Sequence, residues 1–384
     1  MAYHEQLSID GLGCEDDVAR YLKALSLSLV IAVFLGGVAL VFLLILSGGR
    51  PVDFVQRAVL RLALSNRQAE LDQPIGTDDT PIRFTIAPGD PPALIARRLV
   101  ENGLIADPIL FTNYLRLEGL DVELEAGIYF LRQTQSLRQI ALALTDSRSS
   151  NITFTVLPGW RIEEVAAAID RSRLFAFNGA QFLALVSAGA PVDPNFAELV
   201  GLPQGASLEG FLFPETYVLP PDISAEELRD TLLNAFISAT VPQMRADAQA
   251  QGLTLRDVAT LASIIQREAV HDREHSMIAS VYRNRLAIGM MLQADPTVQY
   301  GLNGARGSWW PRITQADYQS VASPYNTYRV QGLPPGPIAN PSLSALRAAL
   351  YPAESAYYYF RARCDGSNLH NFSTTYEEHL ASGC

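Results

Sequence analysis

Two kinds of residue are scarce in this chain of 384 residues, and each shortage excludes a class of protein. The three cysteines form no Cys-x-x-Cys pair, so there is no signal for a zinc ribbon. Lysine and arginine number 29 against 40 acidic residues, which gives a net charge of −11. No basic stripe is present to meet phosphates, and the composition therefore argues against nucleic-acid binding.

One long hydrophobic segment is present. Residues 25–46 carry no charge, and about 20 apolar residues are enough to span a bilayer. A cleaved signal peptide has an apolar core of about 7–15 residues behind a basic N-terminus, whereas residues 1–24 here include five acidic side chains. We therefore predict a single uncleaved transmembrane helix at 25–46 after a short cytoplasmic tail at 1–24.

The flanking charges conflict with an outward orientation. Arg20 and Lys23 precede the segment, and four arginines between positions 50 and 67 follow it. A count of positive charges would keep the large domain in the cytoplasm, although long domains translocate largely regardless of charge. In an outward orientation Cys364 and Cys384 would share an oxidising compartment, where they either pair or remain two thiols.

Beyond the membrane segment we predict a stalk and linker at 47–81, with helical spacing of apolar residues at 52–71 and a Pro- and Gly-containing linker at 72–81. A weak repeat follows, because residues 83–90 (RFTIAPGD) match residues 153–160 (TFTVLPGW). Each copy predicts a strand, a Pro-Gly turn and a helix. The first copy extends into a small α+β module at 82–150 that resembles a LysM-like module. Such modules bind N-acetylglucosamine-containing glycans, and the alternative is a structural spacer.

The most informative segment is 261–269 (LASIIQREA). Ala262, Ile265 and Ala269 have the spacing of a buried helix face, and Glu268 lies at or beside that face. A poorly solvated carboxyl has a raised pKa and can hold a proton near neutral pH, which is what a general acid needs. The alternative is a structural Glu paired with an arginine such as Arg267.

Further motifs surround this segment in a fixed order. They are LEGFLFPETY at 208–217, ASVYRNRL at 279–286, MLQADPTV at 291–298, PYNTY at 324–328, GLPPGPI at 332–338, Asn-Pro at 340–341, and HNFSTTY at 370–376 with His379. Together they resemble the catalytic domain of the endolytic murein transglycosylases, the MltG or YceG-like family, from about residue 153 onward.

The resemblance implies an α+β catalytic domain at 151–384 that needs no metal or organic cofactor. It would act as a lytic transglycosylase on peptidoglycan, cleaving the bond between N-acetylmuramic acid and N-acetylglucosamine. Glu268 would protonate the glycosidic oxygen and then accept the proton of the muramic C6 hydroxyl, giving a 1,6-anhydro end. An ordinary glycosidase instead needs two carboxylates. The resemblance also implies an extracytoplasmic domain on the plasma membrane, with the cell-wall synthesis and division machinery as partners.

Several other residues are candidates for substrate binding. Glu209 and Glu215 bracket an aromatic Gly-Phe-Leu-Phe-Pro segment, and the alternative is that they cap helices or pair with arginines. Polar residues in segments predicted to be loops suit the recognition of N-acetyl and hydroxyl groups: Gln293, Asp295, Tyr325, Asn326 and Thr327. For Asp295, which precedes a proline, a turn is equally compatible. His370, Phe372 and Thr374 alternate as one strand face would, forming either a cleft wall or, for the histidine, a buried structural site.

Two other functions are compatible with parts of the sequence. His271, Glu274 and His275 fit the His-x-x-Glu-His pattern of inverted zinc proteases, but their flanks are polar and offer little shielding for a metal. A catalytically silent peptidoglycan-binding scaffold would keep the cleft without turnover, and the intact Glu268 argues against it.

Overall fold

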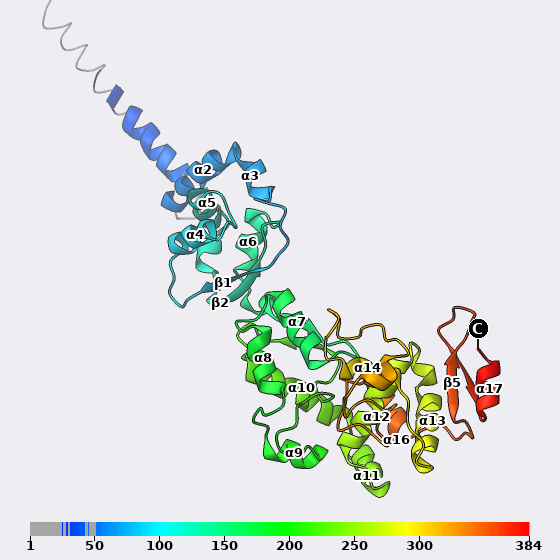
Figure 1. Cartoon of the computed structure of the whole chain (residues 1–384). Helices are drawn as coiled ribbons and strands as arrows, with labels where there is room; N and C mark the ends of the chain where they lie inside the picture. Colours follow the sequence, from blue (N-terminus) through cyan, green and yellow to red (C-terminus); the bar gives the residue numbers. More distant parts are fainter. Residues whose placement is uncertain (1–24, 26–27, 30, 43–44, 46–50, 384) are drawn as a thin grey trace, which may run out of the picture. The chain divides into compact units, whose positions relative to one another are not determined.

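The computed structural model describes residues 25, 28–29, 31–42, 45 and 51–383 (Figure 1). The chain divides into two compact units. The first comprises Met1–Asp79, Ala87–Ala126 and Gln133–Thr145, and the second comprises Thr80–Ile86, Gly127–Arg132 and Asp146–Cys384. The predicted module boundary at 82–150 does not coincide with this division, and the predicted domain limits remain a prediction.

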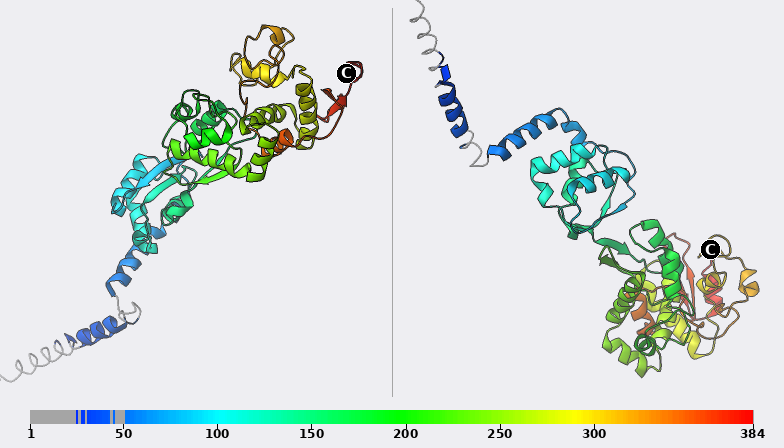
Figure 2. Two further views of the ribbon diagram at one scale, coloured as in Figure 1. Left: turned by 90° about the horizontal axis from the view of Figure 1, so that it is seen from below. Right: turned by 90° about the vertical axis from the view of Figure 1, so that its left-hand side faces the viewer.

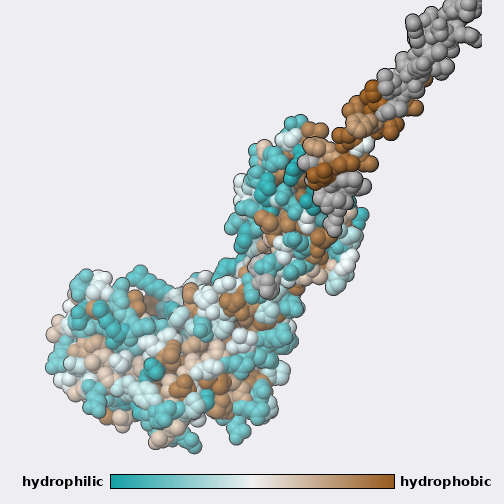
Figure 3. All heavy atoms as spheres, turned by 180° about the vertical axis from the view of Figure 1, so that it is seen from behind, coloured by the Kyte–Doolittle hydropathy of each residue, from teal (hydrophilic) through white to brown (hydrophobic). Residues whose placement is uncertain are grey.

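The predicted membrane segment is described only in part. Residues 31–42 form a helix whose large apolar side chains, among them Val33 and Phe34, are exposed, and they give the brown stretch in Figure 3. Six residues of the 25–46 segment and all of the 1–24 tail lie outside the described residues. Within the described ranges, no helix is both long and apolar enough to cross a bilayer.

The first unit is helical. Helix α5 (Pro108–Glu118) packs against α2 (Pro51–Ser65) and α4 (Pro92–Glu101), and α3 (Gln68–Asp72) packs against α6 (Leu137–Ala143). The predicted helix at 52–71 is thus two helices, α2 and α3. Asp107 accepts hydrogen bonds from the backbone N–H groups of Ile109 and Leu110 at the start of α5, and it also pairs with Arg67 at 2.7 Å. A short 3₁₀ turn, η1 (Leu120–Val122), follows α5.

The second unit holds three two-stranded antiparallel sheets. Strand β1 (Ile82–Ile86) pairs with β2 (Gly127–Leu131), β3 (Ile152–Thr155) with β4 (Thr216–Leu219), and β5 (Tyr359–Ala362) with β6 (His370–Ser373). Gly89 and Gly159 have φ values of 86° and 81°, and helices α4 and α7 (Ile162–Ser172) follow them. The repeated order of strand, Pro-Gly turn and helix is therefore confirmed, while the likeness to LysM remains a prediction.

The remaining elements of this unit are mostly helices, which confirms the α+β class. They are η2 (Ser147–Ser150), α8 (Gly179–Val186), α9 (Pro194–Val200), α10 (Ala225–Ala239), α11 (Pro242–Ala250), α12 (Leu255–Glu268), η3 (Asp272–Glu274), α13 (His275–Ala287), α14 (Asp295–Gly301), α15 (Asp317–Ser320), α16 (Leu343–Leu350) and α17 (Tyr376–Ala381). Strands β5 and β6 and helix α17 lie together beside α13, as Figures 1 and 2 show.

Helix α12 forms the centre of the second unit. It starts at a capping box between Thr254 and Asp257, and all residues from Val258 to Ile265 are buried. A helix that is buried all round belongs to the core, and α12 packs against α16, α13 and α14. The predicted face with Ala262 and Ile265 is confirmed, and Ala269 follows the last residue of the helix.

Asn340 joins two of the motif segments described in the sequence analysis. Its side-chain oxygen accepts hydrogen bonds from the backbone N–H groups of Gly210 and Leu212, and its amide donates to the carbonyl of Trp160. Gly210 has a φ of 88°, and a Cβ there would lie 2.3 Å from the Cβ of Pro337. The motifs at 208–217 and 332–341 are therefore packed against each other, and only glycine fits at the contact.

Candidate active site

Glu268 is the last residue of α12, and it opens into a cavity of about 480 Å³. The side chain is partly exposed, at the point where the buried helix ends. Its Oε1 accepts a hydrogen bond of 2.8 Å from the hydroxyl of Tyr282, a fully buried residue of α13. The carboxyl is thus held at one oxygen, and the other oxygen is left for a ligand.

The surroundings of Glu268 favour its protonated form. Burial raises its pKa from 4.5 to about 7, and the nearby carboxylate of Asp295 adds to the rise. The hydrogen bond from Tyr282 and the charge of Arg285 act in the opposite direction. A carboxyl with a pKa near neutrality suits a general acid.

The cavity wall is built from elements far apart in the sequence. Of the predicted binding residues, the structure brings Gln293, Asp295 and His370 to this cavity together with Glu268. Arg285 also lines the cavity, together with all four residues of β5 and four aromatic or histidine residues from other elements. The β5 residues are Tyr359, Phe360, Arg361 and Ala362, and the other four are Tyr318, Tyr328, Tyr376 and His379.

Gln293 and Asp295 lie in the segment that leads into α14. Gln293 has a left-handed backbone with φ of 50°, which is uncommon for a residue with a side chain and is often found at functional sites. Asp295 accepts a hydrogen bond of 2.7 Å from the hydroxyl of Tyr328. Asp295 is therefore both the first residue of α14 and a carboxylate facing the cavity, so the turn and the site interpretations are compatible.

Thr327 and Asn326 hold this segment in place and are not part of the cavity wall. Thr327 is buried, and its hydroxyl accepts from the backbone N–H of Ala294 and bonds the hydroxyl of Thr297. Asn326 is buried, and its amide donates to the carbonyls of Tyr318 and Val321. Their side chains supply hydrogen-bond partners to N–H and carbonyl groups of the loop backbone, which would otherwise be buried without partners.

Three further predicted residues lie away from the cavity wall. The ring of Tyr325 lies 4.7 Å from that of Tyr300, tilted by 51°, and Phe372 packs against Tyr357 and Phe360. Thr374 follows the end of β6 and is exposed, since the strand stops at Ser373. The shared strand face is therefore formed by His370 and Phe372 alone, whose rings lie 6.5 Å apart.

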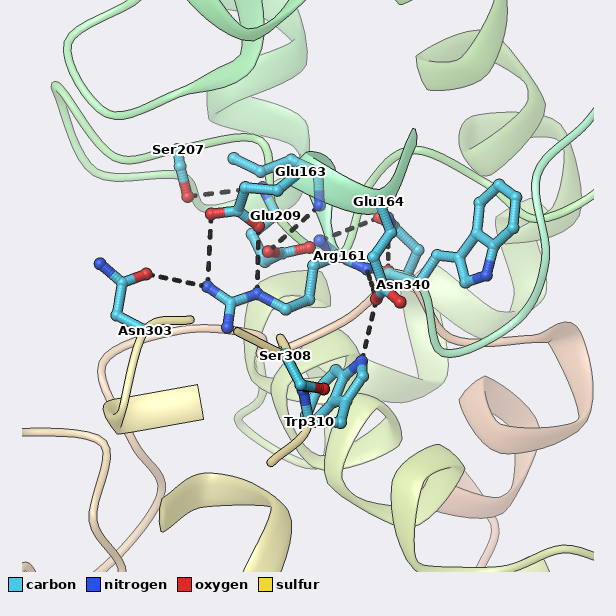
Figure 4. Close-up of polar contacts among 12 residues, drawn as sticks. Arg161, Glu163, Glu164, Ser207, Glu209, Asn303, Ser308, Trp310 and Asn340 are labelled. Atoms are coloured by element: carbon cyan, nitrogen blue, oxygen red, sulfur yellow. Dashed lines mark hydrogen bonds and ion pairs between the residues drawn. The ribbon is translucent and has the colours of Figure 1, made fainter. Parts of the chain in front are cut away.

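Glu209 and Glu215 also lie outside the cavity wall, and Glu215 is exposed. Glu209 is fully buried beside the start of α7, where its Oε2 accepts from the backbone N–H of Ile162 (Figure 4). Burial, with the nearby Glu163, raises the pKa of Glu209 to about 8. Glu209 thus caps a helix, which was one of the two interpretations of the sequence.

Glu209 belongs to a second polar cluster around Arg161 (Figure 4). The Arg161 guanidinium is buried over the ring of Tyr300, at 4.2 Å, and it pairs with Glu163 at 3.0 Å. Trp310 donates to Glu164 at 2.9 Å, and the guanidinium of Arg267 lies over its ring at 3.8 Å. Arg267 is therefore stacked on an aromatic ring, and no ion pair with Glu268 is found in the described structure.

The His-x-x-Glu-His segment points in three directions. His271 bonds the carbonyl of Ser367, His275 bonds the hydroxyl of Ser344, and Glu274 bonds His370. Among the residues that the structure describes, no group of three or more His, Cys, Asp or Glu side chains could hold a metal ion. His271, Glu274 and His275 therefore bond three different partners and do not converge on one point.

Arg285 and Tyr282 are two of the residues of the site that sequence reasoning missed. Arg285 is buried, and its guanidinium donates to the carbonyls of Tyr358 and Leu292, which joins β5 to the segment before Gln293. Both residues lie in the 279–286 motif, so the motif itself was the available signal. Cys364 is disulfide-bonded, and the other two cysteines, Cys14 and Cys384, lie outside the described residues.

Comparison with known proteins identifies the fold and its relatives. The sequence model of the YceG-like family matches residues 84–383. A Bacillus subtilis protein named endolytic murein transglycosylase is 31% identical over 80% of this chain and 85% of its own length. A Streptococcus pneumoniae protein of the same name is 27% identical over 74% of this chain, which corresponds to about half, 54%, of that relative.

A solved structure agrees with these sequence matches. The crystal structure of a YceG-like protein from Listeria monocytogenes superimposes with a TM-score of 0.52 and 30% identity. The match covers 79% of this chain and 99% of the Listeria chain. The chain belongs to the YceG-like family.

Proposed function

We propose that this member of the YceG-like family is a membrane-anchored endolytic lytic transglycosylase. The relatives named endolytic murein transglycosylase indicate a lyase that acts on peptidoglycan. The observation that carries the proposal for this chain is Glu268. It is a partly buried carboxyl at the wall of a 480 Å³ cavity, held by Tyr282, with a pKa raised to about 7.

The reaction starts from the protonated form of Glu268. The carboxyl donates its proton to the glycosidic oxygen between N-acetylmuramic acid and N-acetylglucosamine. The C6 hydroxyl of the muramic residue attacks C1 as that bond breaks, and its proton passes to a base in the cavity, which is the Glu268 carboxylate if that residue acts alone. The products are a 1,6-anhydro-muramic end and a free 4-hydroxyl, and no water is consumed.

Asp295 supports one alternative, because it places a second carboxylate at the same cavity. A pair of carboxylates flanking the scissile bond is the arrangement of a hydrolytic glycosidase. A muramidase of this kind would release reducing N-acetylmuramic ends, so the chemistry of the new ends separates the two reactions.

Mass spectrometry of the products tests this assignment. The full chain in detergent is incubated with purified peptidoglycan, and the released fragments are analysed for their ends. Ends with 1,6-anhydro-N-acetylmuramic acid are expected, in fragments cut within strands. Reducing muramic ends would assign a muramidase that uses Asp295, and binding without cleavage would leave the silent scaffold as the function.

We also propose that the domain lies on the outer face of the plasma membrane, anchored by the segment at 25–46. The support is the uncharged length of that segment and the location of peptidoglycan. Contacts with the cell-wall synthesis and division machinery are proposed on the same ground. A periplasmic reporter fused after Cys384 should be active. A fusion that is active only with a cytoplasmic reporter would refute both the topology and the access to substrate.

A further inference from the structure

His370 is fixed at the cavity wall by two hydrogen bonds to a single carboxylate, that of Glu274. Its ring Nδ1 lies 2.9 Å from Oε2 of Glu274, and its backbone N–H donates to Oε1 of the same carboxylate, also at 2.9 Å. The side chains are 10% and 9% exposed, so both partners are nearly buried. Two bonds to one carboxylate fix the position of β6 and the rotation of the imidazole ring together.

This contact also sets the tautomer of His370. An ionised carboxylate only accepts hydrogen bonds, so the Nδ1 of His370 carries a proton. In the neutral ring the lone pair is then on Nε2. His370 lines the cavity, and because its Nδ1 is bound to Glu274, Nε2 is the ring nitrogen that no described residue binds. Nε2 is not among the buried polar atoms that lack a partner, so it is accessible. An acceptor nitrogen is thus presented at the cavity that contains Glu268.

The charged groups around this imidazole come from every element packed at the cavity. Besides Glu274 on η3, they are Glu268 on α12, Arg285 on α13, Asp295 on α14, Arg361 on β5 and His379 on α17, together with the hydroxyls of four tyrosines. Arg363 donates to the carbonyl of His370 at 3.2 Å. The imidazole and the Phe360 ring are nearly perpendicular, with their centroids 5.4 Å apart.

We propose that His370 is the base of the reaction, that Glu268 is its acid, and that Glu274 is the positioning residue of His370. The inference rests on the proposed transglycosylase function. As the C6 oxygen of the muramic residue bonds to C1, its proton passes to Nε2 of His370. The bond from C1 to the glycosidic oxygen breaks, and that oxygen receives the proton of Glu268. Transfer of a proton from the imidazolium to the Glu268 carboxylate, directly or through solvent, restores both groups.

The two mechanisms differ in their dependence on pH. If Glu268 acts alone, the reaction needs one protonated group, and the rate falls only as pH rises. If His370 is the base, the rate also falls on the acidic side, because a protonated imidazole cannot accept a proton. The experiment measures the initial rate of anhydro-end formation on uncross-linked glycan strands from pH 4 to 9 for the full chain.

Two variants and one matched control decide the role of His370. His370→Asn should lower the rate by about 10²-fold or more and abolish the acidic limb of the profile. Glu274→Gln can keep both hydrogen bonds, but its amide donates to Nδ1 and moves the ring proton to Nε2, so the rate should fall comparably. His379→Asn, at a second histidine of the wall that has no carboxylate partner at hydrogen-bond distance among the described residues, should retain the acidic limb.

The outcomes separate this inference from the proposed function. If the wild type forms anhydro ends but has no acidic limb, or if His370→Asn and Glu274→Gln keep wild-type rates, the inference is refuted and the transglycosylase function stands. Loss of the acidic limb in His379→Asn alone would assign the base to His379. If His370→Asn lowers the melting temperature, Glu274→Gln carries the test, since its shape and hydrogen bonds are conserved. Formation of no anhydro ends by the wild type would refute the proposed function itself.

Discussion

Replacement of Glu268 by Gln removes one ionisable proton and little else, so its effects can be worked out from the structure. With a pKa of about 7, roughly half of the Glu268 carboxyls carry a proton at pH 7, whereas at the ordinary value of 4.5 fewer than about one in a hundred would do so. The amide of Gln cannot donate and then recover a proton. The variant should therefore lose about 10²–10⁴-fold in turnover.

The same substitution should stabilise the fold at neutral and alkaline pH. The pKa of Glu268 is raised in the folded state, so its contribution to stability is fully present below pH 4.5, decreases as the unfolded chain ionises, and is lost by pH 7. A rise from 4.5 to about 7 corresponds to up to about 3 kcal/mol. Gln has no such dependence, and it can still accept the hydrogen bond from Tyr282.

Two measurements check these expectations. Anhydro-end formation gives the turnover, and thermal unfolding at pH 4 and pH 8 gives the stability. The advantage of Glu268→Gln in melting temperature should be larger at pH 8 than at pH 4. Glu209→Gln serves as the control for activity, because Glu209 is a buried carboxyl away from the cavity wall. Near-normal turnover of Glu268→Gln together with an inactive Glu209→Gln would make Glu209 the acid and refute the assignment.

Three further predictions follow from individual contacts. Tyr282→Phe removes the hydrogen bond that lowers the pKa of Glu268, so the alkaline limb of the rate profile should move to higher pH, and an unmoved limb would contradict the role of Tyr282. Gly210→Ala should lower the free energy of unfolding in urea by about 2–5 kcal/mol, because the position has a positive φ and a Cβ there would collide with Pro337. Gly205→Ala is the control: that position also has a positive φ but open space around it, so the loss of stability should be smaller. Prolonged chelation should leave turnover unchanged, and chelator-sensitive peptidase activity with bound zinc would revive the His-x-x-Glu-His interpretation.

The sequence predicted the site best where a helical run of apolar residues contains a single carboxylate. The apolar spacing at 262 and 265 correctly predicted a buried helix with Glu268 beside its face. Gln293, Asp295 and His370 were also placed in the site from their motifs, and the structure brings them to one cavity with Glu268. The role of each at the cavity stays a prediction until substrate binding is measured.

The sequence was less informative for polar residues whose partner is backbone. Asn326, Thr327 and Glu209 look like ligand-binding residues because they are polar and lie in loops, but each is buried against main-chain groups. The hydrogen-bond requirement of a buried loop cannot be seen from its side chains alone. Tyr282 and Arg285 were missed for a related reason, because helical periodicity shows which face is buried and does not show which element it meets.

The order of the cavity elements along the chain also matters for when the protein becomes active. Helix α12 with Glu268 is synthesised well before β5, β6 and α17, which supply the opposite wall at 359–379. A growing chain that has reached only α16 carries the acid but has neither His370 nor a closed cavity. The site of a protein that cuts the cell wall is therefore completed only after residues 359–379 have been synthesised.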